Sequence, residues 1–333
     1  MSATSALHGA ASTIFSNLFV KLPYPDGDSL RGQTVIVTGS NQGLGFEASK
    51  HLVRLGVERL IMGVRSIEKG EAARREMLQQ SGAKTTIDVW QVDLESYESV
   101  KAFANRASTL PRLDAILANA GIMTTEFNKA EGNERTLTVN VISTFLLCLL
   151  LVPKMRESAS QFHATPRIVI PNSALHYMAP LKEVEPNNSL TIFDRLSDPK
   201  TADMGNRYPL SKLLVIYVVR ELAGLLNKQG KMGVIINTPN PSFCKSQLAR
   251  EMAGLGMRVA ERMLARSTEE GSRALVHGLM AGPESSGQYL TNCHVQAPSS
   301  SVTSQKGQGI QKRVFDELVQ KLEKISPGLM ASL

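Results

Sequence analysis

A short β-branched run that ends in a glycine-rich turn sets the fold class of this chain. Residues 33–38 (QTVIVT) predict a strand, residues 39–45 (GSNQGLG) form a turn with three glycines, and residues 46–55 have the pattern of an amphipathic helix. Glycines let a backbone approach a pyrophosphate closely, and the free N–H groups at the start of a helix bind it. Strand, glycine turn and helix in this order predict a dinucleotide-binding unit. Its contacts are expected from Gly39, Asn41, Gln42, Gly43, Leu44 and Gly45.

Strands and helices alternate along the rest of the chain. Further strands are predicted at residues 59–64, 86–92, 114–118, 167–170, 233–237 and 287–293, and helices at 68–80, 99–108, 134–155, 208–226 and 269–280. Apolar strands separated by helices are typical of a parallel sheet that is covered on both faces. We therefore expect one α/β domain over residues 31–296, a Rossmann-type doubly wound parallel sheet of about seven strands. The apolar run at residues 141–152 is shorter than the roughly 20 residues that cross a bilayer, so it predicts a buried helix.

The end of the second predicted strand indicates which dinucleotide binds. NAD-binding sites usually have an acidic residue there, which holds the ribose 2′-hydroxyl, but this chain has Arg65-Ser66, with Lys69 one helical turn later. A guanidinium group can clasp a 2′-phosphate, so we expect NADP(H) rather than NAD(H). The third predicted strand ends at Asp93-Leu94, where a carboxylate can accept a hydrogen bond from the adenine amino group.

Tyr208 and Lys212 lie four residues apart in a segment with a helical pattern, so their side chains should lie on one helix face. A phenol has an ordinary pKa of about 10, and a nearby ammonium group stabilises the phenolate and lowers that pKa. The pair is therefore a candidate general acid and base near neutral pH. Because this spacing often occurs by chance, its weight comes from the other motifs of the chain.

Together these motifs resemble the short-chain dehydrogenase/reductase family in its classical form. Thr38-Gly39 with Gly43 and Gly45 matches the cofactor loop of that family. Residues 119–121 match its NAG motif, and its catalytic tetrad is matched in order by Asn140, Ser173, Tyr208 and Lys212. The resemblance covers roughly residues 31–294. Residues 65–70 (RSIEKG) are similar to the retinol-dehydrogenase-like branch and its fungal secondary-metabolite relatives, which mostly use NADP(H).

The resemblance implies a role for each member of the tetrad. Ser173 would hydrogen-bond the substrate carbonyl, and Tyr208 would deliver a proton as hydride arrives from the nicotinamide. Lys212 would bind the nicotinamide ribose and lower the pKa of the tyrosine. Asn140 would hold a water that links Lys212 to solvent. Further cofactor contacts are implied for Asn119, Ala120, Gly121, Pro241 and Ser246.

Three departures from the family pattern accompany the match. Pro171-Asn172 replaces the small residue and the serine that commonly precede the catalytic serine, and a proline should end the strand there. Residues 174–207 lengthen the connection from Ser173 to Tyr208, and their prolines and asparagines predict a surface excursion of turns near the site. Pro241-Ser242 stands where the family usually has Pro-Gly, so we expect the loop to approach the cofactor differently.

The expected activity is the NADPH-dependent reduction of a ketone or aldehyde in a medium-sized apolar metabolite, and a fungal natural-product ketoreductase is the narrower expectation. A methionine-rich helix at residues 246–266, within a substrate flap at about 243–266, favours an apolar substrate, although such a stripe can equally pack on the core. The alternatives are an alcohol dehydrogenase of the retinol or steroid type, a non-catalytic NADP(H)-binding protein and a template for a non-redox cyclisation.

The composition limits the partners and the compartment. The net charge of +7 is spread along the chain and not gathered into a basic block with aromatics, which argues against nucleic-acid binding. Cys148, Cys244 and Cys293 are few and far apart, so they fit neither a disulfide framework nor a metal site and indicate a reducing, cytoplasmic compartment. The expected partner is a small-molecule carbonyl or alcohol substrate. Whether the chain forms a homo-oligomer stays open.

Both ends of the chain are expected to lie outside the domain. Residues 1–30 predict an arm that packs Phe15, Leu18, Phe19 and Val20 onto the body, with membrane tethering as the alternative and no stable membrane insertion. Residues 297–309 are rich in Ser, Gln and Gly and predict a mobile link. Residues 310–333 contain an amphipathic helix that docks either on the body or on a partner.

Overall fold

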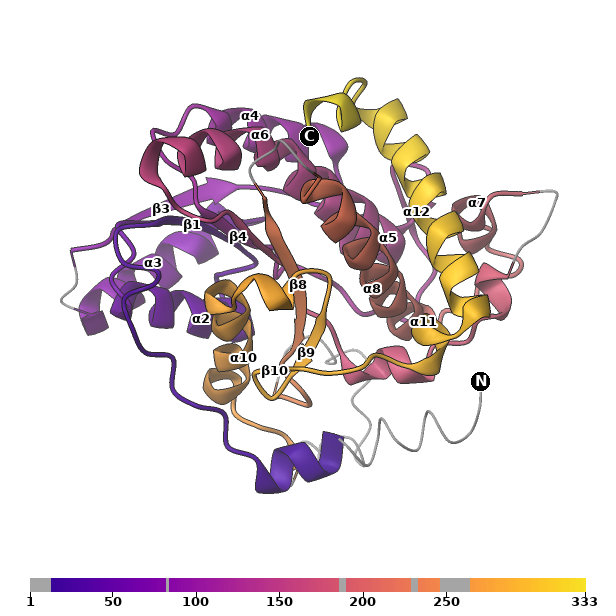
Figure 1. Cartoon of the computed structure of the whole chain (residues 1–333), viewed down its shortest axis with the longest axis horizontal. Coiled ribbons are helices and arrows are strands. Elements are labelled where there is room, and N and C mark those ends of the chain that lie inside the picture. Colours follow the sequence, from indigo (N-terminus) through magenta and orange to yellow (C-terminus); the bar gives the residue numbers. More distant parts are fainter. Residues whose placement is uncertain (1–12, 82–83, 186–189, 229–232, 246–263) are drawn as a thin grey trace.

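The computed structural model describes residues 13–81, 84–185, 190–228, 233–245 and 264–333. Its described strands form a large sheet in the order β10-β9-β8-β7-β4-β1-β2-β3, and a separate short ribbon of β5 and β6 (Figure 1). The strands of the large sheet are β1 (Thr34–Thr38), β2 (Arg59–Val64), β3 (Thr86–Gln91), β4 (Ala115–Leu117), β7 (Arg167–Val169), β8 (Ile235–Asn240), β9 (Tyr289–Thr291) and β10 (His294–Val295). The ribbon is β5 (Lys129–Ala130) with β6 (Asn133–Glu134).

Neighbouring strands of the large sheet run parallel, except that β10 is antiparallel to β9. The expected doubly wound parallel sheet is therefore confirmed, and β10 adds an antiparallel edge. The chain builds outward from β1 to β3 and then returns to place β4 on the other side of β1. This reversal leaves a crevice beyond the carboxyl ends of β1 and β4, where ligands bind in sheets of this kind.

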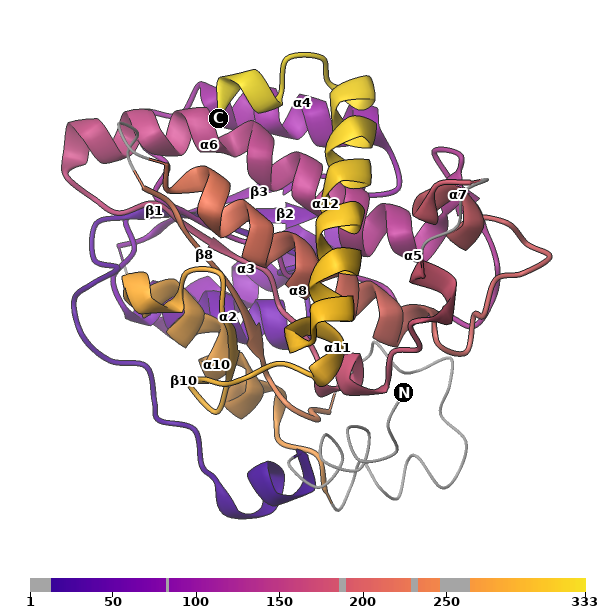
Figure 2. The ribbon, with the colours of Figure 1, turned by 45° about the vertical axis from the view of Figure 1, so that its right-hand side comes forward.

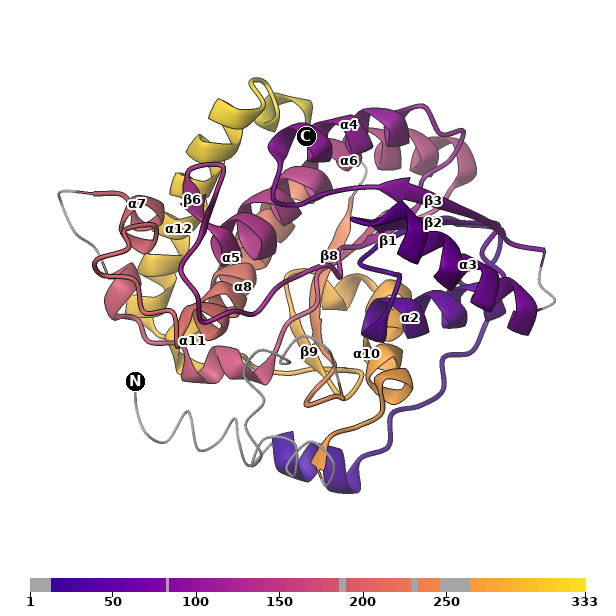
Figure 3. The same ribbon diagram turned by 180° about the vertical axis from the view of Figure 1, so that it is seen from behind.

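Alternate residues of β1 supply the two hydrophobic cores, because successive strand side chains point to opposite faces. Ile36 packs with α4 (Tyr97–Ser108), α6 (Thr144–Phe162) and α8 (Arg207–Leu226). Val35 and Val37 pack on the other face with α2 (Gly43–Arg54), α3 (Ile67–Ser81) and α10 (Thr268–Met280). The sheet is the middle of three layers, and in Figure 3 the helices α4 and α6 lie above the strands and α2 and α3 below them.

The stretch Arg135–Phe162 is long and apolar enough to cross a membrane by composition, but 89% of its most apolar window is buried inside the protein. It comprises α5 (Arg135–Leu137), the π-helical segment η1 (Thr138–Ser143) and α6. Phe145 and Leu146 are fully buried at its centre. The prediction of a buried helix at residues 141–152 is thus confirmed.

The carboxyl-terminal helix α12 (Gln305–Ile325) lies along α8 (Figure 2) and docks on the body through Ile310, Val314, Leu318 and Leu322, all buried. The residues predicted to form a mobile link contain the short helix α11 (Ser300–Thr303) and the first turn of α12. The long helix begins at Gln305 and not at residue 310, because Ser304 accepts a hydrogen bond from the N–H of Gly307 and caps it. A short 3-10 turn, η6 (Met330–Ser332), ends the chain.

Residues 174–207 contain more than the surface turns that we expected. The 3-10 turns η2 (Ala174–Met178) and η3 (Lys182–Val184) are followed by α7 (Ile192–Leu196). Ile192 and Phe193 are fully buried, and the N–H of Ile192 donates to Glu317 on α12 at 2.6 Å. Ile192 and Phe193 therefore place part of the segment in the core. The prediction of surface turns considered the prolines and asparagines of the segment and did not weigh these apolar residues. A further 3-10 turn, η5 (Pro283–Ser285), precedes β9.

The prediction that the N-terminal arm packs its aromatic side chains onto the body is wrong for the described residues. Residues 13–19 are helical, yet Phe15, Leu18 and Phe19 are 59%, 51% and 72% exposed. The buried face of this helix carries Ser16, which is 4% exposed. Hydrogen bonds between polar groups attach this helix, whereas Leu22 and Leu30, farther along the arm, are buried against the body.

Candidate active site

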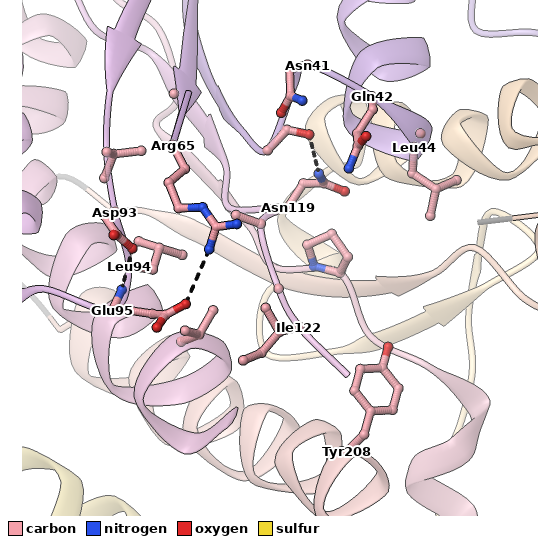
Figure 4. Close-up of a pocket in the computed structure, with 18 of the residues that line it drawn as sticks. Asn41, Gln42, Leu44, Arg65, Asp93, Leu94, Glu95, Asn119, Ile122 and Tyr208 are labelled. Atoms are coloured by element: carbon pink, nitrogen blue, oxygen red, sulfur yellow. Dashed lines mark hydrogen bonds and ion pairs between the residues drawn. The ribbon is translucent and has the colours of Figure 1, made fainter. Parts of the chain in front are cut away.

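A pocket of about 370 Å³ lies at the carboxyl ends of β1, β2, β4 and β7, at the reversal point of the sheet (Figure 4). Of the residues predicted to bind a cofactor or to act in catalysis, those that line it are Gly39, Asn41, Gln42, Gly43, Leu44, Arg65, Asp93, Leu94, Asn119, Ala120, Gly121, Tyr208, Lys212 and Pro241. Gly45, Ser66, Lys69, Asn140 and Ser173 are not part of this lining. Ser246 and the methionine-rich segment from residue 246 to 263 lie outside the described residues.

The glycine turn after β1 has the backbone geometry that only glycine adopts easily. Gly39 and Gly43 have φ values of +65° and +60°. Gly45 is required for a different reason, because a Cβ there would lie 2.5 Å from the carbonyl oxygen of Gly39. The turn is therefore compact and leads directly into α2. The free N–H groups of the first turn of α2 are at the end of the helix that lies at the pocket.

The loop at residues 119–121 is fastened to the glycine turn. The Asn119 side chain donates to the carbonyl oxygens of Thr38 and Gly39 at 3.0 and 3.3 Å, and the N–H of Ala120 donates to the Thr38 hydroxyl at 3.0 Å. These bonds join the ends of β1 and β4 across the reversal point, so the two loops form one continuous wall of the pocket.

Arg65, Asp93 and Glu95 form the charged end of the pocket (Figure 4). The Arg65 side chain is 68% exposed and lies 3.4 Å from a carboxylate oxygen of Glu95, which also accepts from Arg135 at 2.8 Å. Asp93 accepts from the N–H of Glu95 at 2.9 Å. The guanidinium of Arg65 therefore remains accessible to an anion, with one carboxylate beside it.

Ser66 and Lys69 have a local structural role. The N–H of Lys69 donates to the Ser66 hydroxyl oxygen at 3.3 Å at the start of α3. This contact satisfies one of the free N–H groups of the first helical turn. Lys69 is exposed.

Tyr208 and Lys212 lie at the other end of the pocket on the first turns of α8, and Figure 4 shows the Tyr208 hydroxyl pointing into it. The Lys212 ammonium donates to the carbonyl oxygen of Pro171 at 2.8 Å and lies 5.5 Å from the centre of the Tyr208 ring. Burial raises the pKa of Tyr208 and lowers the pKa of Lys212 to about 8. The pKa of Tyr208 thus lies above its ordinary value and not below it, and the cause is desolvation of the buried phenol.

Asn140 lies in the π-helical segment η1 and uses its side chain to hold the neighbouring loop. Its amide nitrogen donates to Ile122 O at 2.9 Å and to the Ser211 hydroxyl at 3.2 Å, and its oxygen accepts from the Ile122 N–H at 2.9 Å. The Ser211 hydroxyl in turn donates to the carbonyl oxygen of Tyr208 at 2.8 Å. Asn140 therefore joins the loop at Ile122 to helix α8, and both of its amide N–H groups are engaged by protein atoms.

Ser173 follows β7, which ends at Val169 just before Pro171, as the proline predicts. Its hydroxyl oxygen caps η2 by accepting from the Leu175 N–H at 3.2 Å, so the O–H remains able to donate. The preceding Asn172 donates to Lys212 O at 3.1 Å and accepts from the Ser173 N–H at 2.8 Å. Asn172 thus joins the strand end that carries Ser173 to the helix that carries Lys212.

Sequence reasoning missed several residues that line the pocket, and the ones that bear on its chemistry are Glu95, Ile122, Val139 and Asn172. Glu95 and Asn172 stand within two residues of predicted site residues, at the ends of β3 and β7. Their position at the carboxyl edge of a parallel sheet is the signal that could have found them. Ile122 and Val139 carry no such signal, because an apolar residue at these places is equally typical of the core.

The loop after β8 contains Pro241, which lines the pocket, and Ser242, which has a φ of +67°. This left-handed backbone is the conformation that a glycine would adopt without strain. Ser242 therefore has the backbone conformation that the family's usual glycine would adopt readily.

The fold and the pocket define an α/β protein with a Rossmann-type sheet and a pocket at its reversal point. A model of the short chain dehydrogenase family matches residues 33–165. The chain is 42% identical over 324 residues to the short chain dehydrogenase/reductase dmxR8 from Cryptosporiopsis sp., covering 96% of this chain and 99% of that protein. It is 40% identical over 334 residues to the short-chain dehydrogenase anuD from Penicillium roqueforti, covering 98% and 86%. The chain belongs to the short-chain dehydrogenase/reductase family, as its motifs indicated.

A solved structure is similar over most of the fold. The short-chain dehydrogenase from Sphingobium yanoikuyae in complex with NADPH matches with a TM-score of 0.53 at 19% identity, covering 74% of this chain and 84% of that one. At this identity the likeness concerns the fold, and it agrees with the Rossmann-type sheet described above.

Proposed function

We propose that this protein is an NADPH-dependent carbonyl reductase of a medium-sized, largely apolar metabolite. One observation carries the proposal: Tyr208 and Lys212 line the same pocket as the glycine turn after β1. Reduction of a carbonyl needs a hydride for the carbon and a proton for the oxygen. A bound dinucleotide held by the turn would supply the first, and Tyr208 would supply the second. Membership of an oxidoreductase family supports this assignment.

The pocket fits the dinucleotide by its own chemistry. Gly39 and Gly43 leave the turn free of side chains where the backbone N–H groups would receive the pyrophosphate. Arg65 is the accessible cation at the other end, and it would pair with a 2′-phosphate. The glycine turn supports either dinucleotide, and Arg65 favours NADP(H) over NAD(H). When bound, the nicotinamide contributes the hydride, and the remaining steps belong to the protein.

The proton step rests on Tyr208. Because burial raises the pKa of this phenol, it stays protonated at neutral pH and acts as a donor. The Ser173 hydroxyl, whose O–H is not used in capping η2, would hold the substrate oxygen. Lys212, fixed by Pro171 O, would bind ribose hydroxyls and stabilise the phenolate that forms as the proton leaves.

The apolar nature of the substrate is supported by described residues. Ile122 and Val139 line the pocket, and Figure 4 shows the Ile122 side chain on the same side of the pocket as Tyr208. A carbonyl placed against the phenol would therefore have hydrocarbon around it. Apolar surface buried in this way contributes roughly 25 cal/mol per Å² to binding.

A panel of ketones and aldehydes with NADPH and NADH side by side tests the proposal. We expect NADPH absorbance to fall with at least one apolar carbonyl compound and faster than NADH absorbance. Tyr208→Phe should bind NADPH as the wild type does and lose at least a hundredfold in kcat, since it keeps the ring and removes the proton. If Tyr208→Phe keeps full activity, the mechanism is wrong.

The same assay separates the alternative functions. An alcohol dehydrogenase of the retinol or steroid type would use the same residues in reverse and would show NADPH formation from NADP⁺ and an apolar alcohol. A non-catalytic binding protein would bind NADPH without turnover of any compound. A cyclisation template would form product with no change in NADPH absorbance.

A further inference from the structure

We infer that Asn17, in the N-terminal arm, is a positioning residue for the pocket loop at residues 241–245. This loop follows β8 and contributes Pro241 to the pocket lining. Asn17 does not line the pocket itself. The inference uses NADPH as its probe and in that respect rests on the proposed function.

The side chain of Asn17 makes three hydrogen bonds to the body of the protein. Its amide nitrogen donates to the carbonyl oxygens of Phe243 and Leu264, each at 2.7 Å, and its oxygen accepts from the Ser242 hydroxyl at 2.6 Å. An amide carries two N–H donors, so both are used. One side chain of the arm thus holds two consecutive residues of the pocket loop, Ser242 and Phe243, together with Leu264.

Ser242 shows why the loop needs such a contact. Its φ of +67° is unfavourable for a residue with a Cβ. Two hydrogen bonds fix it there: its N–H donates to the Asn240 side chain at 2.9 Å, and its hydroxyl donates to Asn17. A glycine would keep this shape without help. The serine has therefore made the loop dependent on a residue from the other end of the chain.

The arm is anchored so that Asn17 stays in register with the loop. Arg266, which is 3% exposed, donates to the carbonyl oxygens of Ser16 and Val20, each at 2.7 Å. Arg266 also pairs with the loop, because its N–H donates to Phe243 O and its carbonyl oxygen accepts from the Lys245 N–H, each at 2.9 Å. The same arginine therefore holds the arm and the pocket loop.

These contacts explain the orientation of the arm. Its helix turns Ser16 and Asn17 toward the body and leaves Phe15 and Phe19 exposed, so polar contacts attach the helix, while apolar burial in the arm begins at Leu22. A polar attachment is specific in direction, since each bond requires one donor and one acceptor at a fixed place. Such an attachment suits the placement of a loop better than the filling of a core.

Asn17→Ala, Ser242→Gly and the double variant test the inference, with Lys21→Ala as the control from an exposed position of the same arm. The dissociation constant for NADPH is measured by fluorescence titration, and the melting temperature of each variant is recorded. Asn17→Ala should weaken NADPH binding about tenfold with little change in melting temperature, because a loop that is no longer pre-positioned must be ordered on binding. Ser242→Gly should bind as the wild type does.

The double variant shows whether the effect of Asn17→Ala on NADPH binding depends on Ser242. Because glycine holds the loop shape unaided, Asn17→Ala should cost clearly less than tenfold in the Ser242→Gly background. Unchanged NADPH binding in Asn17→Ala would overturn the inference. If the melting temperature of that variant falls while binding is unchanged, Asn17 has a purely structural role. If the wild type itself fails to bind NADPH, the proposed function falls together with the inference.

Discussion

The Nε atom of Arg207 lies 3.4 Å from a carboxylate oxygen of Glu134, and both side chains are fully buried. Arg207 opens α8 one residue before Tyr208, and Glu134 caps the helix that leads into η1 and Asn140. Arg207 also lies 3.2 Å from Glu183. One buried charge cluster thus fixes the starts of the two helices that carry Asn140 and Tyr208 relative to each other.

Arg207→Met should destabilise the protein strongly. Removing the guanidinium leaves Glu134 buried without its counter-charge, and breaking a buried ion pair from one side costs about 3–5 kcal/mol. Urea unfolding measures this loss. Arg59→Met is the matched control, because the Arg59–Asp88 pair is about one-third exposed and its loss should cost under about 1 kcal/mol. Equal effects of the two substitutions would contradict the prediction.

The rate of carbonyl reduction should fall as the pH rises through about 8. Burial lowers the pKa of Lys212 to about 8, so its amine is charged below this pH and neutral above it. The Tyr208 pKa is raised, so the phenol stays protonated over the same range and does not cause the change. A profile of kcat/KM from pH 6 to 10 measures it. Lys212→Arg remains charged and should lack this transition, even if its activity is lower.

Arg65→Ser should reduce affinity for NADPH by about ten- to a hundredfold and leave affinity for NADH nearly unchanged, since a hydrogen bond to a charged group contributes about 1.5–3 kcal/mol. Calorimetric titration with both dinucleotides measures the ratio. A parallel loss for the two cofactors would place Arg65 away from the 2′-phosphate.

Glu95→Gln should act in the opposite direction from Arg65→Ser. The Glu95 carboxylate lies 3.4 Å from the Arg65 guanidinium and would also repel a phosphate. The amide removes this charge while keeping the shape, so NADPH should bind several-fold more tightly at low salt and the gain should shrink as salt is added. Unchanged affinity at low ionic strength would show that Glu95 stays paired with Arg135 and does not compete.

The sequence was sufficient for those parts of the fold and site that local chemistry determines. The strand at residues 59–64 was predicted with its observed bounds, because an apolar run bounded by charged residues has few alternatives. The glycine turn, Arg65 and the Tyr208–Lys212 pair were found because each needs a particular residue type at a particular spacing. In each of these cases, neighbours along the chain provide the structural cause.

Features that depend on distant contacts were not predictable in this way. The arm was expected to bury Phe15, yet its attachment depends on Arg266 and Asn292, about 250 residues or more away. The side chain of Asn140 contacts Ile122 and Ser211 from a π-helical segment, and no residue pattern indicated either the segment or these contacts. Periodicity reports which face is apolar, but not which partner a polar group meets.

His176 connects the candidate catalytic Ser173 to the carboxyl-terminal segment. The ring is fully buried against Tyr177 and Tyr289. Its Nδ1 lies 2.8 Å from Ser173 O, and its Nε2 accepts from the Ser299 N–H at 3.2 Å. A carbonyl can only accept and a backbone N–H can only donate, so Nδ1 carries the proton and Nε2 does not. These two partners allow one neutral tautomer only.

The stability of the protein should therefore fall between pH 6.5 and pH 4 in a way that depends on His176. Burial lowers its pKa to about 4, whereas the unfolded chain takes up this proton near 6.5, so protons favour the unfolded state across that window. The shift corresponds to roughly 3 kcal/mol of unfolding free energy. Urea unfolding at pH 7 and pH 4.5 measures it.

His176→Asn, whose amide can still donate to Ser173 O, should lose part of this acid sensitivity. His163→Asn, at an exposed helix end, should retain it in full. If His176→Asn and the wild type lose the same stability on acidification, another group is responsible for the acid sensitivity.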